Sequence, residues 1–435
     1  MRIIILGAIL AMTCAPVGAQ VTVTVNVSNP LNQARGDEPV VLPLHDYGDV
    51  RSALVTADGQ EIACQLDDLD QDEQYDELCF LATLGAMEQK RYSVTLYTEG
   101  EPRQYPARVY AEMLMRNDKV KEKNRHDNYI ESITARGDCA NSYNLQHHHG
   151  VDFESELNGI RIYFDKRQTL DLSGKFKKRL ELKETQFYTS AEQKTQGYGD
   201  DVLWVGNTFG LGAFRGWDGH EPTMIEPVRS RTQRIISYGP LRTIVEIADR
   251  GWKLPAPAAG SPTPSTTTDG RQLTTVNMTL RYTQYAGHRD TDIDVLFSKD
   301  MSSHCFSTGI IDVKDSQEFS DHKGLRACWG TDYPSTDTVN WKRETVGLAI
   351  CIPRQFIVTE VPSARSHAAT TRPQPAGMQG GNYTFVVKPR GNRMRYKVTY
   401  TSANEEFGYH SAQQWFDYLK QWKQQVEAPV AVTVE

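Results

Sequence analysis

The chain lacks three features that mark common functional classes. Beyond its first twenty residues it has no apolar run of about eighteen residues, so no membrane-spanning helix is expected there. It has no CxxC pair, which argues against a cysteine-based zinc site. The formal net charge of -7 gives no basic excess, so neither nucleic acid nor an anionic membrane is expected as a partner. The negative net charge does not exclude an acidic substrate, because a basic groove can lie on the surface of an acidic protein.

Residues 1–19 predict a secretory signal peptide. Arg2 precedes an apolar run of about ten residues, and the small residues Val17, Gly18 and Ala19 provide a cleavage point. We therefore expect a soluble mature protein that is periplasmic or secreted.

Cysteine is scarce once this leader is removed. Cys64 and Cys79 flank one loop, and in an oxidising compartment they are the pair expected to form a disulfide. The other cysteines are predicted as free or paired, and the sequence leaves both alternatives open.

Strand signals dominate and predict an all-β fold. Alternating β-branched and aromatic residues occupy residues 21–27, 91–97, 159–164, 274–285 and 291–298. One helix is predicted near the C-terminus, where a single stripe carries Trp415, Leu419, Trp422 and Val426. We expect that stripe to be a core contact rather than a ligand platform.

The segment at residues 97–110 is the predicted domain boundary. Before it, residues 20–103 suit a small β-sandwich. After it, residues 104–435 are too many for one antiparallel sheet to bury, so stacked large sheets are expected. Two segments rich in Pro, Ser, Thr and Gly, 255–270 and 362–382, are either binding loops or disorder.

An acidic loop in the small domain has the spacing of calcium ligands, with carboxylates at Asp68, Asp70, Asp72 and Asp76. Glu73 stands where such loops usually carry glycine, and Cys79 stands where an EF-hand needs glutamate. The loop is predicted either as a structural calcium site between strands or as a solvated acidic turn. No organic cofactor is expected.

Polar side chains crowd the stretch LQHHHGVDFESELNGIRIYFDKRQTLDLSGK, residues 145–175. In a strand, Ile160 and Ile162 point to one face, and Arg161 and Tyr163 point to the other. The polar set is therefore expected to line a surface while the apolar set packs inward.

A metal site at the three adjacent histidines is not favoured. Neighbours in a strand point to opposite faces, so at most His147 and His149 converge, together with Glu154. A closed zinc site needs three or four such groups.

Acid/base chemistry on a sugar suits the stretch better. A polysaccharide lyase must neutralise a uronate carboxylate, remove the adjacent proton and protonate the leaving oxygen, and His, Arg and Tyr side chains suit those tasks. The candidate catalytic residues are His147, His148, His149, Arg161 and Tyr163. The candidate substrate-binding residues are Glu154, Glu156 and Lys166.

Two alternatives stay open for this stretch. A hydrolase needs two opposed carboxylates, and Glu154 and Glu156 lie too close on one strand to flank a single bond, so a second carboxylate would have to come from elsewhere. The other alternative is a plain hydrogen-bonded strand edge.

Four further residues fit a glycan groove. Trp217 offers a ring for sugar stacking with His220 beside it, and Arg229 and Arg231 share one face of an extended segment suited to a carboxylate or sulfate. Each is also compatible with an ordinary surface turn or ion pair.

The quoted motif, the segments at 197–214 and 280–298, and the acidic loop together resemble a known family over most of residues 40–425. That family comprises secreted Bacteroidota proteins, is catalogued as a domain of unknown function, and is often encoded in polysaccharide-utilisation loci. The large domain resembles the galactose-mutarotase-like β-supersandwich, which carries sugar epimerases, polysaccharide lyases and accessory domains of hydrolases. The resemblance implies a carbohydrate ligand and transfers no catalytic residue.

The leading hypothesis is an exported lyase that cleaves a uronic-acid glycan by β-elimination. A histidine from 147–149 acts with Tyr163 as base and acid, and Arg161 acts with Arg229 or Arg231 on the carboxylate. A non-catalytic glycan-binding protein that uses Trp217 and the two long loops, a glycoside hydrolase and a sugar epimerase are the alternatives.

Overall fold

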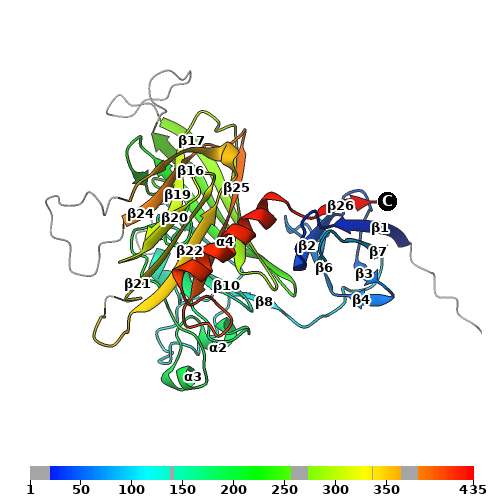
Figure 1. Ribbon diagram of the computed structural model, residues 1–435, viewed down its shortest axis with the longest axis horizontal. Helices are drawn as coiled ribbons and strands as arrows, with labels where there is room; N and C mark the ends of the chain where they lie inside the picture. The colour runs from blue at the N-terminus through cyan, green and yellow to red at the C-terminus, as the bar shows by residue number, and fades with distance from the viewer. Residues whose placement is uncertain (1–19, 138–141, 256–272, 336, 364–380) are drawn as a thin grey trace, which may run out of the picture.

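The computed structural model describes residues 20–137, 142–255, 273–335, 337–363 and 381–435. These residues form two β-rich units, a small one joined to a much larger one (Figure 1), and the predicted all-β class is confirmed. The predicted signal peptide and most of the two Pro- and Thr-rich segments lie outside the described residues. Within those ranges, no helix is both long enough and apolar enough to cross a membrane.

The small unit is a sandwich of two antiparallel sheets. The first has the order β26 (Ala431–Val434), β1 (Gln20–Ser28), β7 (Gln89–Tyr97), β3 (Ser52–Ala57) and β4 (Gln60–Ile62). The second has the order β2 (Arg35–Pro43), β6 (Glu77–Leu84) and β5 (Cys64–Asp67). Alternate residues of both sheets face inward and form one apolar core, as expected for strands with one buried face.

The last strand of the chain corrects the predicted domain limits. The large domain was expected to run to residue 435, but β26 pairs with β1, with Val25 opposite Val434. The small unit is therefore built from both ends of the chain, and the segment after β7 leads into the large unit near the predicted boundary.

The predicted disulfide between Cys64 and Cys79 is also corrected, because both thiols are free. In the pairing of β5 with β6, Cys64 lies opposite Phe80 and Cys79 lies opposite Gln65. Directly opposite residues share a face, so a shift of one position places the two thiols on opposite faces of the sheet.

The large unit is a two-layer sandwich. One layer is a nine-stranded sheet in the order β20 (Gln317–Ser320), β21 (Leu325–Asp332), β22 (Glu344–Cys351), β25 (Arg393–Ser402), β18 (Asp290–Phe297), β17 (Leu273–Tyr285), β16 (Arg242–Pro255), β15 (Ser230–Tyr238) and β9 (Ser132–Arg136).

Two shorter sheets form the second layer. A five-stranded sheet has the order β14 (Pro222–Thr223), β13 (Arg215–Trp217), β19 (Phe306–Asp312), β24 (Gly381–Val387) and β23 (Ile357–Val361). A four-stranded sheet has the order β12 (Leu170–Ser173), β11 (Gly159–Tyr163), β10 (Gly150–Ser155) and β8 (Val109–Glu112). Side chains from all three sheets share one continuous core.

Helices cover the outer faces. The short helices α2 (Leu182–Thr185) and α3 (Ala191–Thr195) lie at the lower end of the large unit in Figure 1, and α2 contacts β8 and β10. In the chain, α1 (Ser142–Leu145) precedes β10, and the 3-10 turn η1 (Arg354–Phe356) precedes β23. The predicted C-terminal helix is confirmed as α4 (Ala412–Glu427), which crosses β21 and β22 in Figure 1. Its apolar stripe packs on that sheet, with Trp415 and Leu419 fully buried, as the sequence predicted.

Buried polar contacts join the two units. The Arg242 guanidinium of β16 donates to Asp67 Oδ2 across 2.8 Å and to Glu77 Oε2 across 2.6 Å. Gln65 Oε1 accepts from the backbone N–H of Leu241 across 2.7 Å, and Arg108 pairs with Asp37. These contacts hold the two units in one relative arrangement.

Candidate functional site

The four-stranded sheet presents one polar face, which points away from the core. Its register places Glu112, Asp152, Arg161 and Asp171 directly opposite one another across β8, β10, β11 and β12. The alternate residues of the same strands, including Ile160 and Ile162, pack into the core. The predicted division of the β11 strand into a polar and an apolar face is confirmed. The expectation that the polar set lines a surface is wrong, because Arg161 and Tyr163 are only 4% and 7% exposed.

Arg161, Tyr163 and Asp171 form a closed network on this face. Arg161 Nη2 donates to the Tyr163 hydroxyl across 3.2 Å and pairs with Asp171, and the hydroxyl donates to Asp171 Oδ2 across 2.6 Å. Burial raises the pKa of Tyr163 well above its usual value, so the phenol stays protonated. Arg161 also lies 3.7 Å from Asp201, so two carboxylates of the protein already match its charge. It therefore positions Tyr163 and is not free to bind a substrate carboxylate, which was its expected role.

His149 lies beside this network on a ring of Tyr143. The two rings stack with centroids 3.9 Å apart, and His149 Nδ1 lies 2.9 Å from the Tyr143 carbonyl oxygen. A carbonyl can only accept, so Nδ1 carries a proton and Nε2 keeps the lone pair in the neutral ring. Nε2 has no hydrogen-bond partner among the described residues. Arg167, paired with Asp165, covers the Tyr143 and Tyr163 rings at 4.7 and 4.8 Å.

Backbone strain gathers around the same point. His149 has a φ of 67°, and Phe187, which packs 4.0 Å from the Arg161 guanidinium carbon, has a φ of 61°. A non-glycine residue in this region costs on the order of 1 kcal/mol or more, and such strain is concentrated at functional sites. We call Tyr143, His149, Arg161, Tyr163, Arg167 and Asp171 the acid/base cluster.

The three adjacent histidines diverge. His147 stacks on His126 with ring centroids 3.6 Å apart and bonds the Lys123 carbonyl, so its contacts lie outside the acid/base cluster. His148 is fully buried between Glu112 and Asp152. Burial lowers the pKa of His148 to about 3 and raises that of Glu112 to about 8. The structure therefore brings only His149 of the three to Tyr163.

The remaining candidates of the stretch serve the framework. Glu154 accepts from the Lys175 ammonium and from the backbone N–H groups of Glu181 and Leu182 at the start of α2. Glu156 pairs with Arg108 at 2.6 Å, next to the interface between the units.

Lys166 leaves the cluster as well. It forms a half-exposed ion pair with Glu226 at 2.8 Å. Glu154, Glu156 and Lys166 therefore do not join the acid/base cluster.

The four residues proposed for a glycan groove do not come together with it either. Trp217 is half-buried on β13, and His220 is exposed in the following turn. Arg231 is buried and pairs with Asp249 at 2.7 Å, whereas Arg229 is exposed just before β15. The two arginines were expected to share one open face, but the buried ion pair removes Arg231 from it.

The acidic loop brings together three of its four predicted ligands. Carboxylate oxygens of Asp68, Asp70 and Asp76 lie within 4.8 Å of one another, whereas Asp72 accepts from the Gln74 backbone N–H at 2.9 Å. Asp68 also accepts backbone N–H groups of the loop, including that of Gln71 at 2.7 Å. The loop can hold a hard cation or stand as a hydrogen-bonded turn, so the calcium site stays a prediction.

A second candidate region lies on the opposite side of the sandwich. Register places five alternating charges in one row across the outer face of the nine-stranded sheet: Arg234, Glu246, Arg281, Asp294 and Arg395. Among the described residues, neither Asp294 nor Arg395 forms an ion pair. Both line a cavity of about 390 Å³, which Trp422 of α4 and Val430 also line.

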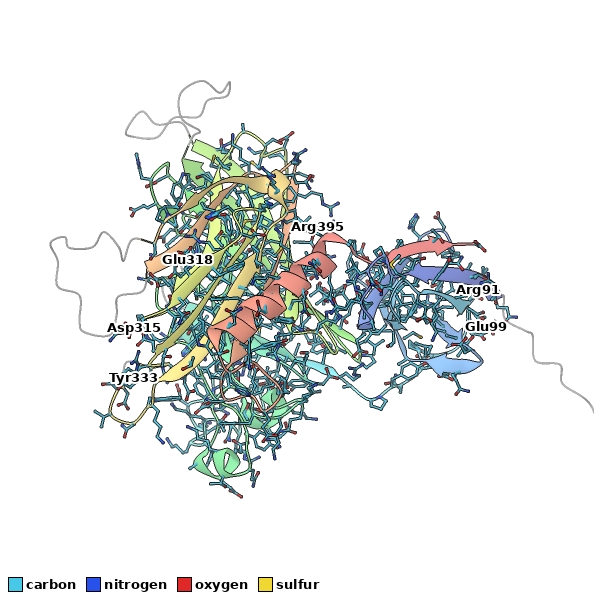
Figure 2. All side chains as sticks on the ribbon, viewed as in Figure 1. Arg91, Glu99, Asp315, Glu318, Tyr333 and Arg395 are labelled. Carbon is cyan, nitrogen blue, oxygen red and sulfur yellow. The ribbon has the colours of Figure 1, made fainter. Side chains whose placement is uncertain are left out.

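We call this cavity the inter-unit groove. Arg395 lies on the side of the large unit that faces the small one in Figure 2. Burial, followed by repulsion from Asp292, raises the pKa of Asp294 above its usual value. A binding site with converging polar groups is expected in a cavity of this kind.

Sequence reasoning missed Glu112, Tyr143, Asp152, Arg167 and Asp171. Asp152, Arg167 and Asp171 lie within the polar stretch, and alternation with Arg161 was a usable signal for Asp152 and Asp171. Glu112 and Tyr143 come from other segments, and only the pairing of β8 and the placement of α1 bring them here.

Comparison with solved structures gives weak likenesses. A glycosyl hydrolase family 38 protein from Enterococcus faecalis matches with 9% identity and a TM-score of 0.47, over 95% of this chain and 47% of that one. An alpha-mannosidase from Enterococcus faecalis V583 matches with 9% identity and a TM-score of 0.44, over 95% and 46%. The chain thus spans about half the length of these proteins, and the scores are too low to carry a conclusion.

No curated protein matches the chain. A family model, described as "Domain of unknown function (DUF4861)", matches residues 27–432 and so includes both units and every strand named in the acid/base cluster. The chain belongs to this family.

Proposed function

We propose that the chain is an exported carbohydrate-active enzyme that cleaves a uronic-acid glycan by β-elimination at the acid/base cluster. One observation carries the proposal. A histidine whose Nδ1 is bonded and whose Nε2 has no partner in the described part of the chain stands beside a tyrosine whose hydroxyl is held by a carboxylate and a guanidinium. The choice of a glycan rests on the sequence resemblance.

The reaction needs a base and an acid at neighbouring carbons. His149 Nε2 takes the proton on the carbon next to the uronate carboxylate, the bond from the β-carbon to the glycosidic oxygen breaks, and a carbon–carbon double bond forms. The Tyr163 hydroxyl turns its proton from Asp171 to the leaving oxygen, and the proton on His149 then passes through water to the Tyr163 oxygen, which restores both groups. The ring centroids of His149 and Tyr163 lie 6.4 Å apart, at 78° to each other, which suits two groups acting on one sugar ring.

The cations of the cluster take separate tasks. Arg167 pairs with Asp165, but it is the more exposed of the two arginines, with 19% of its side chain accessible, and we assign it to the uronate carboxylate. Arg161 stays paired with Asp171 and holds the phenol.

Hydrolysis is less favoured by these contacts. It requires two carboxylates facing one bond. Glu154 and Glu156 are both committed to framework contacts, with Lys175 and Arg108.

The test is an ultraviolet assay for the unsaturated product on a panel of acidic polysaccharides. We expect the absorbance to rise with at least one uronate glycan. The rate of that rise should be lower by about a hundredfold or more in His149→Gln. The matched control is His410→Gln, because His410 is exposed and its Nδ1 also lies near a backbone carbonyl oxygen, at 3.0 Å from Ala403. Full activity in His149→Gln, or release of reducing sugar without the unsaturated chromophore, contradicts the proposal.

A second candidate function has its own support. The inter-unit groove supports non-catalytic binding of an acidic glycan, because Arg395 on its wall has no ion-pair partner among the described residues and can contact a carboxylate. In that case the chain binds a glycan without turnover, Arg395→Ala lowers affinity and His149→Gln does not. Calorimetric titration of both variants with the same glycan separates the two functions.

A further inference from the structure

Glu112, His148 and Asp152 form a fully buried trio at the polar face of the four-stranded sheet. His148 Nε2 lies 3.3 Å from Glu112 Oε1, and His148 Nδ1 lies 3.1 Å from Asp152 Oδ2. One ligand atom from each residue falls within 4.8 Å of the other two. Each side chain has an exposed fraction of 0%.

The trio is short of partners. Among the described residues, Glu112 Oε1, His148 Nε2 and both carboxylate oxygens of Asp152 make no hydrogen bond, although each atom is buried. By contrast, His148 Nδ1 lies 3.3 Å from the Gly150 carbonyl oxygen. The Glu112 and Asp152 residues are also directly opposite on β8 and β10, where like charges destabilise the pairing. An isolated buried carboxylate costs several kcal/mol, so something must compensate these two.

The neighbouring cation supplies only part of that compensation. Arg161 stands opposite Asp152 on β11, but it pairs with Asp171 and lies 3.7 Å from Asp201. Glu112 Oε2 accepts from the Tyr110 hydroxyl at 2.8 Å, which adds a hydrogen bond and no charge. With both carboxyl groups ionised, the trio therefore carries negative charge that no neighbouring cation fully matches.

We propose that Glu112, His148 and Asp152 hold one divalent transition-metal ion of the zinc class. An imidazole nitrogen with two carboxylate oxygens suits zinc and its neighbours, whereas calcium and magnesium prefer sets of oxygen ligands only. The ligands come from β8, from β10 and from the turn between α1 and β10. The ion joins these three elements and fixes the turn that also carries His149. The site does not depend on the β-elimination proposal.

Shared protons are the competing explanation. If the two carboxylic groups hold protons, the trio is neutral and needs no metal. The two explanations differ in metal content and in the response to amide variants. Asp152→Asn and Glu112→Gln remove metal ligands in one case and only mimic the protonated state in the other.

The experiment measures metal by mass spectrometry in protein purified from metal-replete medium. We expect one zinc-class ion per chain in the parent protein and a loss of affinity of at least about tenfold in His148→Gln. The matched control is His220→Gln, which changes an exposed histidine in the same way and should leave the metal content unchanged.

A second readout covers variants that fold poorly. The parent protein is unfolded and refolded with a chelator, with Zn²⁺, or with Co²⁺. We expect a higher melting temperature with Zn²⁺ and a visible cobalt absorption band that His148→Gln lacks. Trace metal in the purified parent protein, together with equal melting temperatures with chelator and with Zn²⁺, overturns the proposal in favour of shared protons.

Discussion

The Tyr163 hydroxyl donates a 2.6 Å hydrogen bond to Asp171 Oδ2, on the face of a sheet whose other side is core. Tyr163→Phe removes this hydroxyl and keeps the ring. We expect kcat to fall by about a hundredfold or more with little change in KM, because a general acid contributes to the transition state. Steady-state kinetics on a uronate glycan measure both constants.

Tyr105→Phe is the control for that variant. Tyr105 also donates to a carboxylate, at 2.9 Å from Glu61, but in the small unit. It should leave kcat unchanged, and an equal loss in both variants would remove the catalytic role of Tyr163.

The Arg242 pair should determine how firmly the two units dock. Arg242→Met leaves the buried Asp67 carboxylate without its cation, and loss of one partner of such a pair costs about 3 kcal/mol or more. Denaturant unfolding measures the free energy. The double variant Arg242→Met with Asp67→Leu should recover much of the loss, and a single variant within about 0.5 kcal/mol of the parent contradicts this role.

Stability should depend on pH through His288, at the same interface. Its Nε2 bonds the Asp37 carbonyl at 2.8 Å, and its Nδ1 lies 3.1 Å from Asp290, which also faces Lys397. Burial lowers the pKa of His288, but the bond to Asp290 and the attraction of its charge outweigh this, so the pKa is raised above its usual value.

The sign of the effect follows from the raised pKa. The protonated form is favoured in the folded state, so its contribution is fully present below about pH 6.5 and is lost as the pH rises through the raised folded value. We expect the melting temperature of the parent protein to fall over that range relative to His288→Gln. Parallel pH profiles of the two proteins would contradict the role of His288.

Calcium should stabilise the small unit if the acidic loop holds it. Calcium then raises the melting temperature in the parent protein and not in Asp70→Asn, because Asp70 is one of three carboxylates that converge. Asp46→Asn changes an exposed carboxylate outside the loop and is the control. An equal response in Asp70→Asn and the parent protein indicates a solvated turn.

Alternation in the sequence was enough to predict the strands and the polar face of β11. Arg161 and Tyr163 share that face because strand side chains repeat every two residues. Alternation did not predict how the three histidines diverge, because they lie in the turn between α1 and β10 and not in a strand, and His147 and His149, which were expected to converge, contact different residues. The stripe through Trp415 and Leu419 likewise predicted the helix and its buried side.

Long-range pairing could not be predicted. Which strand lies beside β10 decides whether Asp152 meets Glu112, and nothing local encodes that choice. The return of β26 to β1 depends on the same kind of information. Register also decides single contacts: a shift of one residue separates Cys64 from Cys79.

The mass of the cleavage products tests the central claim most directly. Elimination at the acid/base cluster adds no water, so the new non-reducing end should be lighter by one water than a hydrolysis product of the same length. We predict such unsaturated oligosaccharides from a uronate glycan with the parent protein and with His410→Gln, and none above background with Tyr163→Phe. Products that carry the added water, or unsaturated products formed equally well by Tyr163→Phe, would contradict the account.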